Sequence, residues 1–184
     1  MVNVVKYLNS MKIFSEIHTE RLILRIFTLE YLTNKYVDWL NDSEVVKYSE
    51  QRHKLHTLST CREYYESFKN QSNLFLVILI KDNLEHVGNI TVLIDKNNLV
   101  ADVAILIGEK TVWGEGYGKE AFVGIMNYLL QNSVVRKVTA GTMSINKPML
   151  AIMHSSGMVA DGVRRGQFIV DGKEVDMVMT AAWS

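Results

Sequence analysis

The stretch W-G-E-G-Y-G-K-E-A at residues 113–121 decides how this chain folds and what it can bind. Its three glycines, Gly114, Gly116 and Gly118, directly precede a segment in which apolar residues recur with helical period: Ala121, Phe122, Ile125, Met126, Leu129 and Leu130. The glycines therefore lie where a loop becomes the N-terminus of a helix. Unpaired backbone N–H groups and the positive end of the helix dipole meet there and attract phosphate. We therefore expect this loop to hold a phosphate-bearing ligand.

Neighbouring residues separate this loop from other glycine-rich loops. A P-loop needs a Ser or Thr after its glycine–lysine pair and a glycine five positions before it. Here Glu120 follows the pair, and Trp113 lies five positions before Gly118. A dinucleotide fingerprint is formally met within residues 116–121. It normally lies in the first strand–helix turn and is followed about 20 residues later by an acid, which residues 137–143 lack. A turn that only lets the helix pack remains the structural alternative.

Three segments together resemble the GNAT N-acetyltransferases. Residues 101–107 followed by the glycine loop look like motif A of that family, which has Q/R-x-x-G-x-G/A after a strand. Residues 146–149 and 156–158 are similar to its Asn-x-x-Ser and Gly-Phe segments, with Met149 and Met158 in place of the small residue and the Phe. The opening T-E-R-L-I-L-R at residues 19–25 looks like that of the subgroup that includes the ribosomal-protein N-terminal acetyltransferases. A weaker likeness links residues 39–45 to amino-sugar acetyltransferases.

The resemblance implies a cofactor, acetyl-CoA, and a place for each part of it. The glycine loop would hold the diphosphate through backbone N–H groups. The apolar strand before it would run alongside the pantetheine arm, with one N–H facing the thioester oxygen. The residues expected to contact the cofactor are Ile105, Leu106, Ile107, Trp113, Gly114, Glu115, Gly116, Tyr117, Gly118, Lys119 and Asn146. No metal is implied.

The attacking amine must lose a proton, and Asp102 is the expected base. Family members with an Ala-Glu-Ile strand carry a glutamate base at this spacing from the loop, and Asp102 is one carbon shorter, which favours a relaying water. A solvent-facing strand carboxylate is the alternative, because strand alternation turns Asp102 away from Val103 and Ile105. The family's usual acidic tyrosine, seven residues after its capping Asn, corresponds to Met153, which cannot donate a proton.

The acceptor would meet a polar segment after the first helical region. Arg52 could pair with a phosphate or carboxylate, and Glu50 and His53 could position or deprotonate an amine. An ordinary solvated loop is the alternative. The expected reaction is direct acetyl transfer to a primary amine of a small molecule or amino sugar. A peptide N-terminus as acceptor, or a non-catalytic domain that binds CoA, stays open, as does a homodimer.

Composition narrows the setting. The chain has 184 residues, 48% of them hydrophobic and 22% charged, and its formal net charge is zero. We therefore expect no pull toward nucleic acid or an anionic membrane. One cysteine excludes an intrachain disulfide and is typical of a reducing, cytoplasmic compartment. No apolar run reaches the roughly 18 residues of a membrane span, and the N-terminus does not resemble a signal peptide.

We predict one α+β domain over residues 17–184, preceded by an N-terminal extension at residues 1–16. Strands are expected at 22–26, 74–80, 85–94, 100–107 and 137–143, followed by a final strand or hairpin to residue 183. Helices are expected at 29–40, at 59–70 with Ser59 as its cap, from the glycine loop to 131, and at 146–156 with Asn146 as its cap. This order predicts a GNAT fold, a mostly antiparallel twisted sheet with helices on both faces.

Overall fold

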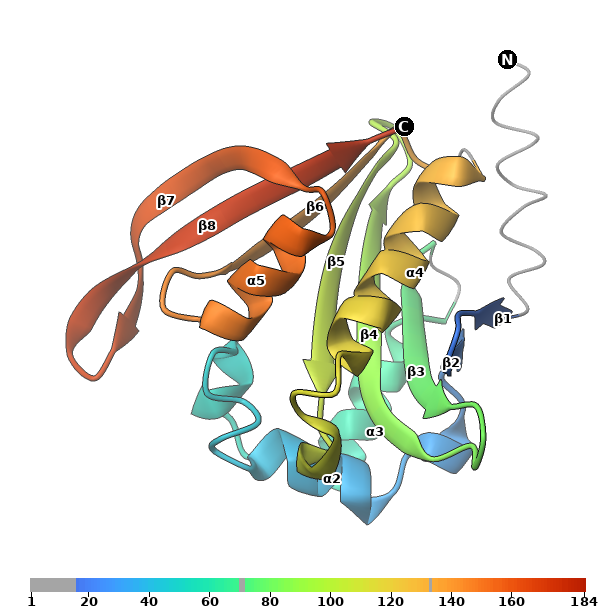
Figure 1. Ribbon diagram of the computed structural model, residues 1–184. Helices are drawn as coiled ribbons and strands as arrows, with labels where there is room; N and C mark the ends of the chain where they lie inside the picture. Colours follow the sequence, from blue (N-terminus) through green and yellow to red (C-terminus); the bar gives the residue numbers. More distant parts are fainter. Residues whose placement is uncertain (1–15, 70–71, 133) are drawn as a thin grey trace.

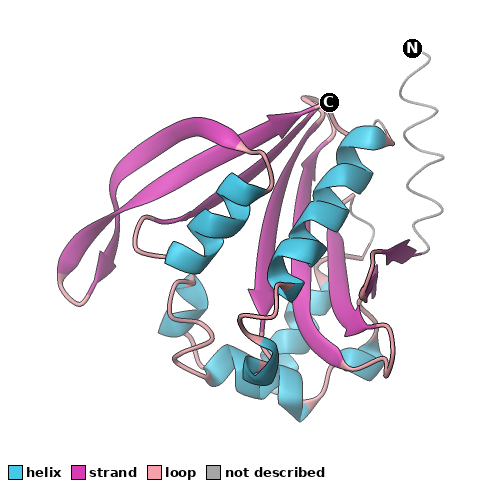
Figure 2. Ribbon diagram, viewed as in Figure 1, coloured by secondary structure: helices cyan, strands magenta, loops and turns pink. Residues whose placement is uncertain are grey.

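A central sheet with helices on both faces forms the protein (Figures 1 and 2). The computed structural model describes residues 16–69, 72–132 and 134–184. Along the chain these form β1 (Glu16–His18), β2 (Leu22–Ile26), η1 (Leu29–Tyr31), α2 (Asn34–Asn41), η2 (Glu50–His53), α3 (Leu58–Glu66), β3 (Leu74–Ile80), β4 (His86–Asp95), β5 (Val100–Ile107), η3 (Lys110–Val112), α4 (Tyr117–Gln131), β6 (Lys137–Met143), α5 (Lys147–Ser155), β7 (Val159–Val170) and β8 (Lys173–Trp183). No helix in these ranges is long and apolar enough to cross a membrane.

The strands pair in the order β1-β2-β3-β4-β5-β6-β8-β7. Every neighbouring pair in this order is antiparallel except β5 and β6, which are parallel. The α4 helix makes the crossover between those two strands, as a parallel connection requires. The predicted α+β architecture is therefore confirmed.

Two apolar clusters hold the helices to the sheet, one on each face. On one face α4 buries a stripe of apolar residues against alternate positions of the central strands, and α5 adds to the same cluster; Phe122, Ile125 and Leu129 are fully buried there. On the other face α2 and α3 pack over β2 and β3 around Phe27, Phe75 and Trp39. Alternation along β5 divides its side chains between these faces: Val103, Ile105 and Ile107 contact the first cluster and Leu106 the second.

Two helix predictions were wrong in detail. The expected helix at 29–40 is broken, because Leu32 takes a non-helical conformation and Thr33 caps a new helix, accepting a hydrogen bond from the Tyr36 N–H. The helix predicted at 59–70 begins at Leu58 and ends at Glu66. Its cap is Thr57 instead of Ser59, because the side chains of Thr57 and Thr60 form a reciprocal capping box.

The predicted extension at residues 1–16 lies outside the described residues except for Glu16. That residue begins β1 and pairs with Arg25 of β2.

Candidate functional site

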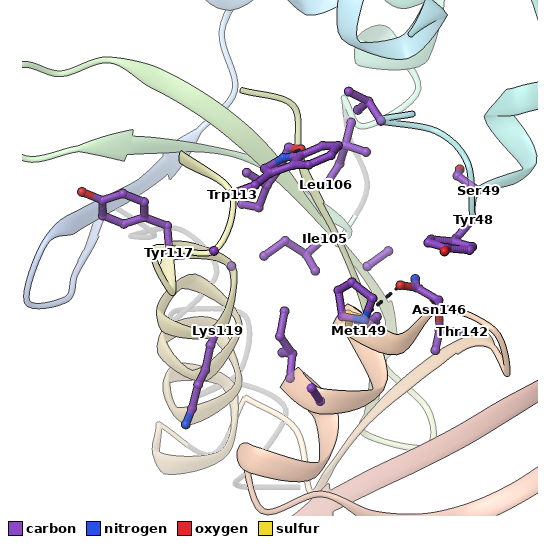
Figure 3. Close-up of a pocket in the computed structure, with 18 of the residues that line it drawn as sticks. Tyr48, Ser49, Ile105, Leu106, Trp113, Tyr117, Lys119, Thr142, Asn146 and Met149 are labelled. Atoms are coloured by element: carbon purple, nitrogen blue, oxygen red, sulfur yellow. Dashed lines mark hydrogen bonds between the residues drawn. The ribbon is translucent and has the colours of Figure 1, made fainter. Parts of the chain in front are cut away.

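The two parallel strands separate soon after they meet, and the site lies in the gap between them. Pairing between β5 and β6 is confined to three positions, of which Asp102 with Thr139 is the last. From Val103 to Ile107, β5 continues in register with β4 on its other side. The edge of β5 that faces β6 therefore borders a gap. A cavity of about 760 Å³ occupies this region (Figure 3).

The cavity is lined from both sides of the sheet. At one end lie the glycine loop, the start of α4 and apolar side chains of α5, including Met149 and Ile152. At the other end lie Glu44, Val45, Tyr48 and Ser49, from the segment between α2 and η2, together with Ala104 and Leu106, the β5 residues on the α2 face of the sheet. We call these the loop end and the acceptor end. In Figure 3, Tyr48 and Ser49 lie across the cavity from the side chain of Lys119.

Backbone conformation at the loop end requires glycine. Gly114 and Gly116 have φ values of +86° and +84°, in the left-handed region that L side chains rarely adopt. Gly116 caps α4, and its carbonyl accepts the first helical hydrogen bond, from Glu120 N–H. A side chain at Gly118 would crowd the cavity wall, since its Cβ would lie 3.3 Å from Ile152. The start of α4, whose first-turn N–H groups have no partner within the helix, therefore borders the cavity.

Trp113 ties this loop to the end of β5. Its indole N–H donates to the Ile107 carbonyl at 2.9 Å. On the other face Gly108, which follows β5, lies directly beneath the ring of Trp39, where a Cβ would be only 2.0 Å from a ring atom. Strand β5 is thus fixed to the loop on one side and to α2 on the other.

Asn146 caps α5 at the cavity wall as the sequence predicts. Its Oδ1 accepts from the Met149 N–H at 3.3 Å, and its Nδ2 donates to the Thr142 hydroxyl at 2.9 Å (Figure 3). Pro148 stands in the first turn of the helix. The cavity therefore has one polar point on its β6 side, formed by Asn146 and Thr142.

The predicted cofactor residues mostly meet in the cavity. Of that set, Glu115 is absent from the lining, whereas Ile105, Leu106, Ile107, Trp113, Gly114, Gly116, Tyr117, Gly118, Lys119 and Asn146 are present. In Figure 3 the ring of Tyr117 points away from the cavity, so only part of that residue borders it.

Asp102 lies just before the gap and outside the cavity lining. Its Oδ2 accepts a hydrogen bond from the Thr139 hydroxyl at 2.7 Å. Alternation along β5 places its side chain on the same face of the sheet as Ala104 and Leu106, which do line the cavity. Its role as base stays a prediction.

The three predicted acceptor residues do not line the cavity. Arg52 turns toward β6 and β7, and it donates to the carbonyls of Ser49 at 3.0 Å and Ile169 at 3.3 Å. It also pairs with Glu50 at 2.7 Å, and only 15% of its side chain is exposed. Glu50 and His53 are exposed. Their substrate role stays a prediction that the arrangement does not support.

The sequence located this segment but singled out other residues of it, since the side chains that line the acceptor end are those of Glu44, Val45, Tyr48 and Ser49. The Glu44 carboxylate is already bonded to Lys110 at 2.9 Å, and Lys110 also pairs with Asp42 at 2.7 Å. Hydrogen bonds to these carboxylates raise the pKa of Lys110, and the bond from Lys110 lowers the pKa of Asp42. The charges beside the acceptor end are therefore largely paired.

Helix α5 offers no acid to a leaving group at the family's tyrosine position. Met153 is 1% exposed and belongs to the core. The neighbouring His154 is exposed and outside the cavity lining. Within the described residues, no group of three or more His, Cys, Asp or Glu side chains is placed to hold a metal ion.

The comparisons with known proteins agree with this arrangement. The family profile described as "Acetyltransferase (GNAT) domain" matches residues 21–159. A search of curated proteins found no match.

Several solved structures share the fold. A GNAT-family acetyltransferase from Bacillus anthracis superposes with a TM-score of 0.78 at 18% identity, over 91% of this chain and 98% of that chain. Spermidine N-acetyltransferase from Vibrio cholerae, in complex with CoA and spermine, superposes with a TM-score of 0.79 at 16% identity, over 89% of this chain and 95% of that chain. RimL, a ribosomal alpha-N-protein acetyltransferase in complex with coenzyme A, superposes with a TM-score of 0.80 at 12% identity, over 92% of this chain and 98% of that chain.

Proposed function

The chain belongs to the GNAT acetyltransferase family, and from that premise we propose that it transfers an acetyl group from acetyl-CoA directly to a primary amine. One observation carries the proposal. One cavity lies at the gap between β5 and β6, and it is lined by the glycine loop at one end and by residues of the segment between α2 and η2 at the other. The cofactor would occupy the loop end and the amine the acceptor end, so that the two would meet beside β5.

The loop end suits the phosphate half of acetyl-CoA. The N–H groups of the first turn of α4 would hold the diphosphate, helped by the positive end of the helix dipole. Glycines at 114 and 116 let the backbone approach an anion closely, and Asn146 with Thr142 offers polar contact from the opposite wall. When bound, acetyl-CoA supplies the activated acetyl group.

The edge of β5 suits the extended arm of the cofactor. Its side chains there are apolar, so the contacts available to a bound chain in the gap are backbone groups and aliphatic surface. A backbone N–H of residues 105–107 would stabilise the negative charge that develops on the carbonyl oxygen. The aliphatic walls formed by Ile105, Ile107 and Ile152 would exclude water from the reacting atoms.

We assign the proton transfer to Asp102. It is the carboxylate on β5 that shares a face with the acceptor-end residues Ala104 and Leu106, and Thr139 fixes one of its oxygens. Because Asp102 stands back from the cavity, a water would carry the proton from the amine to it. A thiolate whose conjugate thiol has a pKa of roughly 8.5 can leave without a dedicated acid. This is consistent with Met153 at the family's tyrosine position.

The acceptor is a small amine or amino sugar in our proposal. The relatives named above act on a polyamine and on a ribosomal protein, so a peptide N-terminus is the second candidate acceptor. The missing acid at Met153 favours one further alternative, a domain that binds CoA without catalysis.

An amine panel separates these functions. Thiol release from acetyl-CoA is measured with a polyamine, an amino sugar and a peptide that has a free N-terminus, against a reaction without amine. Release that depends on one amine class identifies the acceptor. CoA binding without release above the control identifies the non-catalytic domain, and absence of CoA binding would reject both.

A further inference from the structure

The segment Thr19–Arg21, noticed in the sequence only as part of a family-like opening, packs against the first turns of α4. The Thr19 hydroxyl and the Arg21 backbone N–H both donate to Oε1 of Glu120, each at 2.6 Å. The Thr19 methyl group fits over Gly124, where a Cβ would lie 2.7 Å away. The turn between β1 and β2 is thus fixed to the helix that begins at the glycine loop.

The Arg21 guanidinium extends this contact onto the loop itself. Its Nε donates to Oε2 of Glu120 at 2.7 Å, and its Nη1 donates to the Glu115 carbonyl at 3.0 Å. Its Cζ lies 4.3 Å from the centre of the Tyr117 ring. Its Nη2 lies beside Gly116, 3.4 Å from where a Cβ would stand. One side chain therefore contacts the loop, its capping glycine and the first residue of α4.

The contact between Arg21 and Glu120 also compensates a negative charge at the start of α4. Glu120 lies in the first turn of α4, where a free carboxylate would oppose a bound phosphate. Burial by itself would raise the pKa of Glu120, but hydrogen bonds from Thr19 and Arg21 outweigh it and lower that pKa, so the group is ionised at neutral pH. The adjacent guanidinium compensates this negative charge.

We propose that Arg21 is a positioning residue for the diphosphate of CoA. It holds the Glu115–Gly116 backbone in place and pairs with the Glu120 carboxylate. The negative charge of Glu120 then does not weaken the attraction of the loop N–H groups for a bound phosphate. The inference rests on the proposed use of acetyl-CoA. It predicts an effect confined to the phosphate half of the cofactor.

The experiment compares Arg21→Ala and Arg21→Lys with Arg25→Ala as the matched control. Arg25 lies four residues further along the chain, in β2, and its side chain pairs with Glu16 at 3.2 Å and donates to the Tyr31 hydroxyl at 3.3 Å instead of to the loop. Titration calorimetry with CoA should show about a tenfold loss for Arg21→Ala and a smaller loss for Arg21→Lys, which keeps the charge. Arg25→Ala should bind as the wild type does.

Two further measurements separate positioning from general damage. The KM for acetyl-CoA should rise in Arg21→Ala at unchanged kcat, while the KM for acetyl-pantetheine, which lacks the diphosphate, should stay constant. The double variant Arg21→Ala/Glu120→Gln should recover part of the lost CoA affinity, because the unpaired carboxylate is gone.

Each outcome decides the proposal. Unchanged CoA affinity in Arg21→Ala, or an equal loss in Arg25→Ala, overturns it while leaving the proposed function intact. If circular dichroism shows Arg21→Ala unfolded, Arg21→Lys decides, and wild-type affinity in that variant overturns the inference. If the wild type itself does not bind CoA, the proposed function has failed, and this inference fails with it.

Discussion

The two ends of the cavity are built in different ways. At the loop end, the backbone N–H groups proposed to bind phosphate come from one contiguous segment, residues 113–119, whose conformation depends on glycine at two left-handed positions. The acceptor end is assembled from residues on the α2–η2 segment, β5 and β6, and it offers side chains such as Tyr48 and Ser49. Recognition by backbone is encoded in neighbouring residues, whereas recognition by side chains depends on how distant segments meet.

Arg52 illustrates the difference between the two kinds of recognition, because its position depends on how distant segments meet. Its residue type suits an anionic substrate, yet the short η2 helix turns it toward the carbonyls of Ser49 and Ile169. Tyr48, two residues before η2, lies in the cavity instead. A shift of a few residues thus changes which side chains face the substrate, and nothing local in the sequence sets that shift.

The largest effect is expected at the border of the acceptor end. Asp102→Asn keeps size but removes the proton acceptor, so the rate should fall by about 10²-fold at neutral pH. Activity should recover as the pH rises, because the amine then deprotonates in solution. Asp161→Asn is the control, because it changes a carboxylate on β7 that pairs with Lys137 of β6 at 2.7 Å. A wild-type rate with an unchanged pH profile would show that Asp102 is not the base.

His86 tests how the packing of α2 against the sheet contributes to the stability of the fold. It packs against Trp39, with ring centres 4.9 Å apart, and burial lowers its pKa to about 4. In the unfolded chain the pKa of a histidine is about 6.5. Below that pH the unfolded chain binds a proton that the folded protein does not bind. The stabilising contribution of neutral His86 is therefore present above pH 6.5 and is lost as the pH falls toward 4.

The size of this effect follows from the two pKa values. Between pH 7 and pH 5 the free energy of unfolding should fall by about 2 kcal/mol through His86 alone. Urea unfolding at both pH values, with His86→Gln as the comparison, measures it. An equally steep loss in His86→Gln would show that other groups cause the acid sensitivity.

Asn146→Ala probes the β6 side of the cavity (Figure 3). Losing the cap should cost about 1 kcal/mol of stability, and the KM for acetyl-CoA should rise if the side chain also contacts the cofactor. Thr57→Ala removes a cap of the same kind from α3, away from the cavity. Equal destabilisation of both variants with normal KM values would leave Asn146 a purely structural role.

The smallest effect is expected for Arg52→Ala. Since Arg52 does not line the cavity, the KM for the amine should change by no more than about twofold, which corresponds to roughly 0.4 kcal/mol. A tenfold rise in that KM, with the KM for acetyl-CoA unchanged, would restore Arg52 as a substrate contact.

The sequence predicts the fold well because its signals are local. The apolar run at residues 74–80 and the strand at 100–107 have the predicted bounds, and the glycine loop begins α4 as expected. The errors fall where competing side chains decide: Thr33 restarts a helix, and Thr57 with Thr60 displaces Ser59 as cap. The brace of Arg21 on a loop 94 positions away has no local signal at all.

Calorimetric titration of CoA into the wild type and Gly116→Asp tests the central claim, that the glycine loop holds the cofactor. Gly157→Asp is the control, because Gly157 also has a positive φ, of +78°, but lies after α5 and outside the cavity lining. We predict that Gly116→Asp loses at least about tenfold in affinity while Gly157→Asp binds as the wild type does. Wild-type affinity in a folded Gly116→Asp protein would contradict the account.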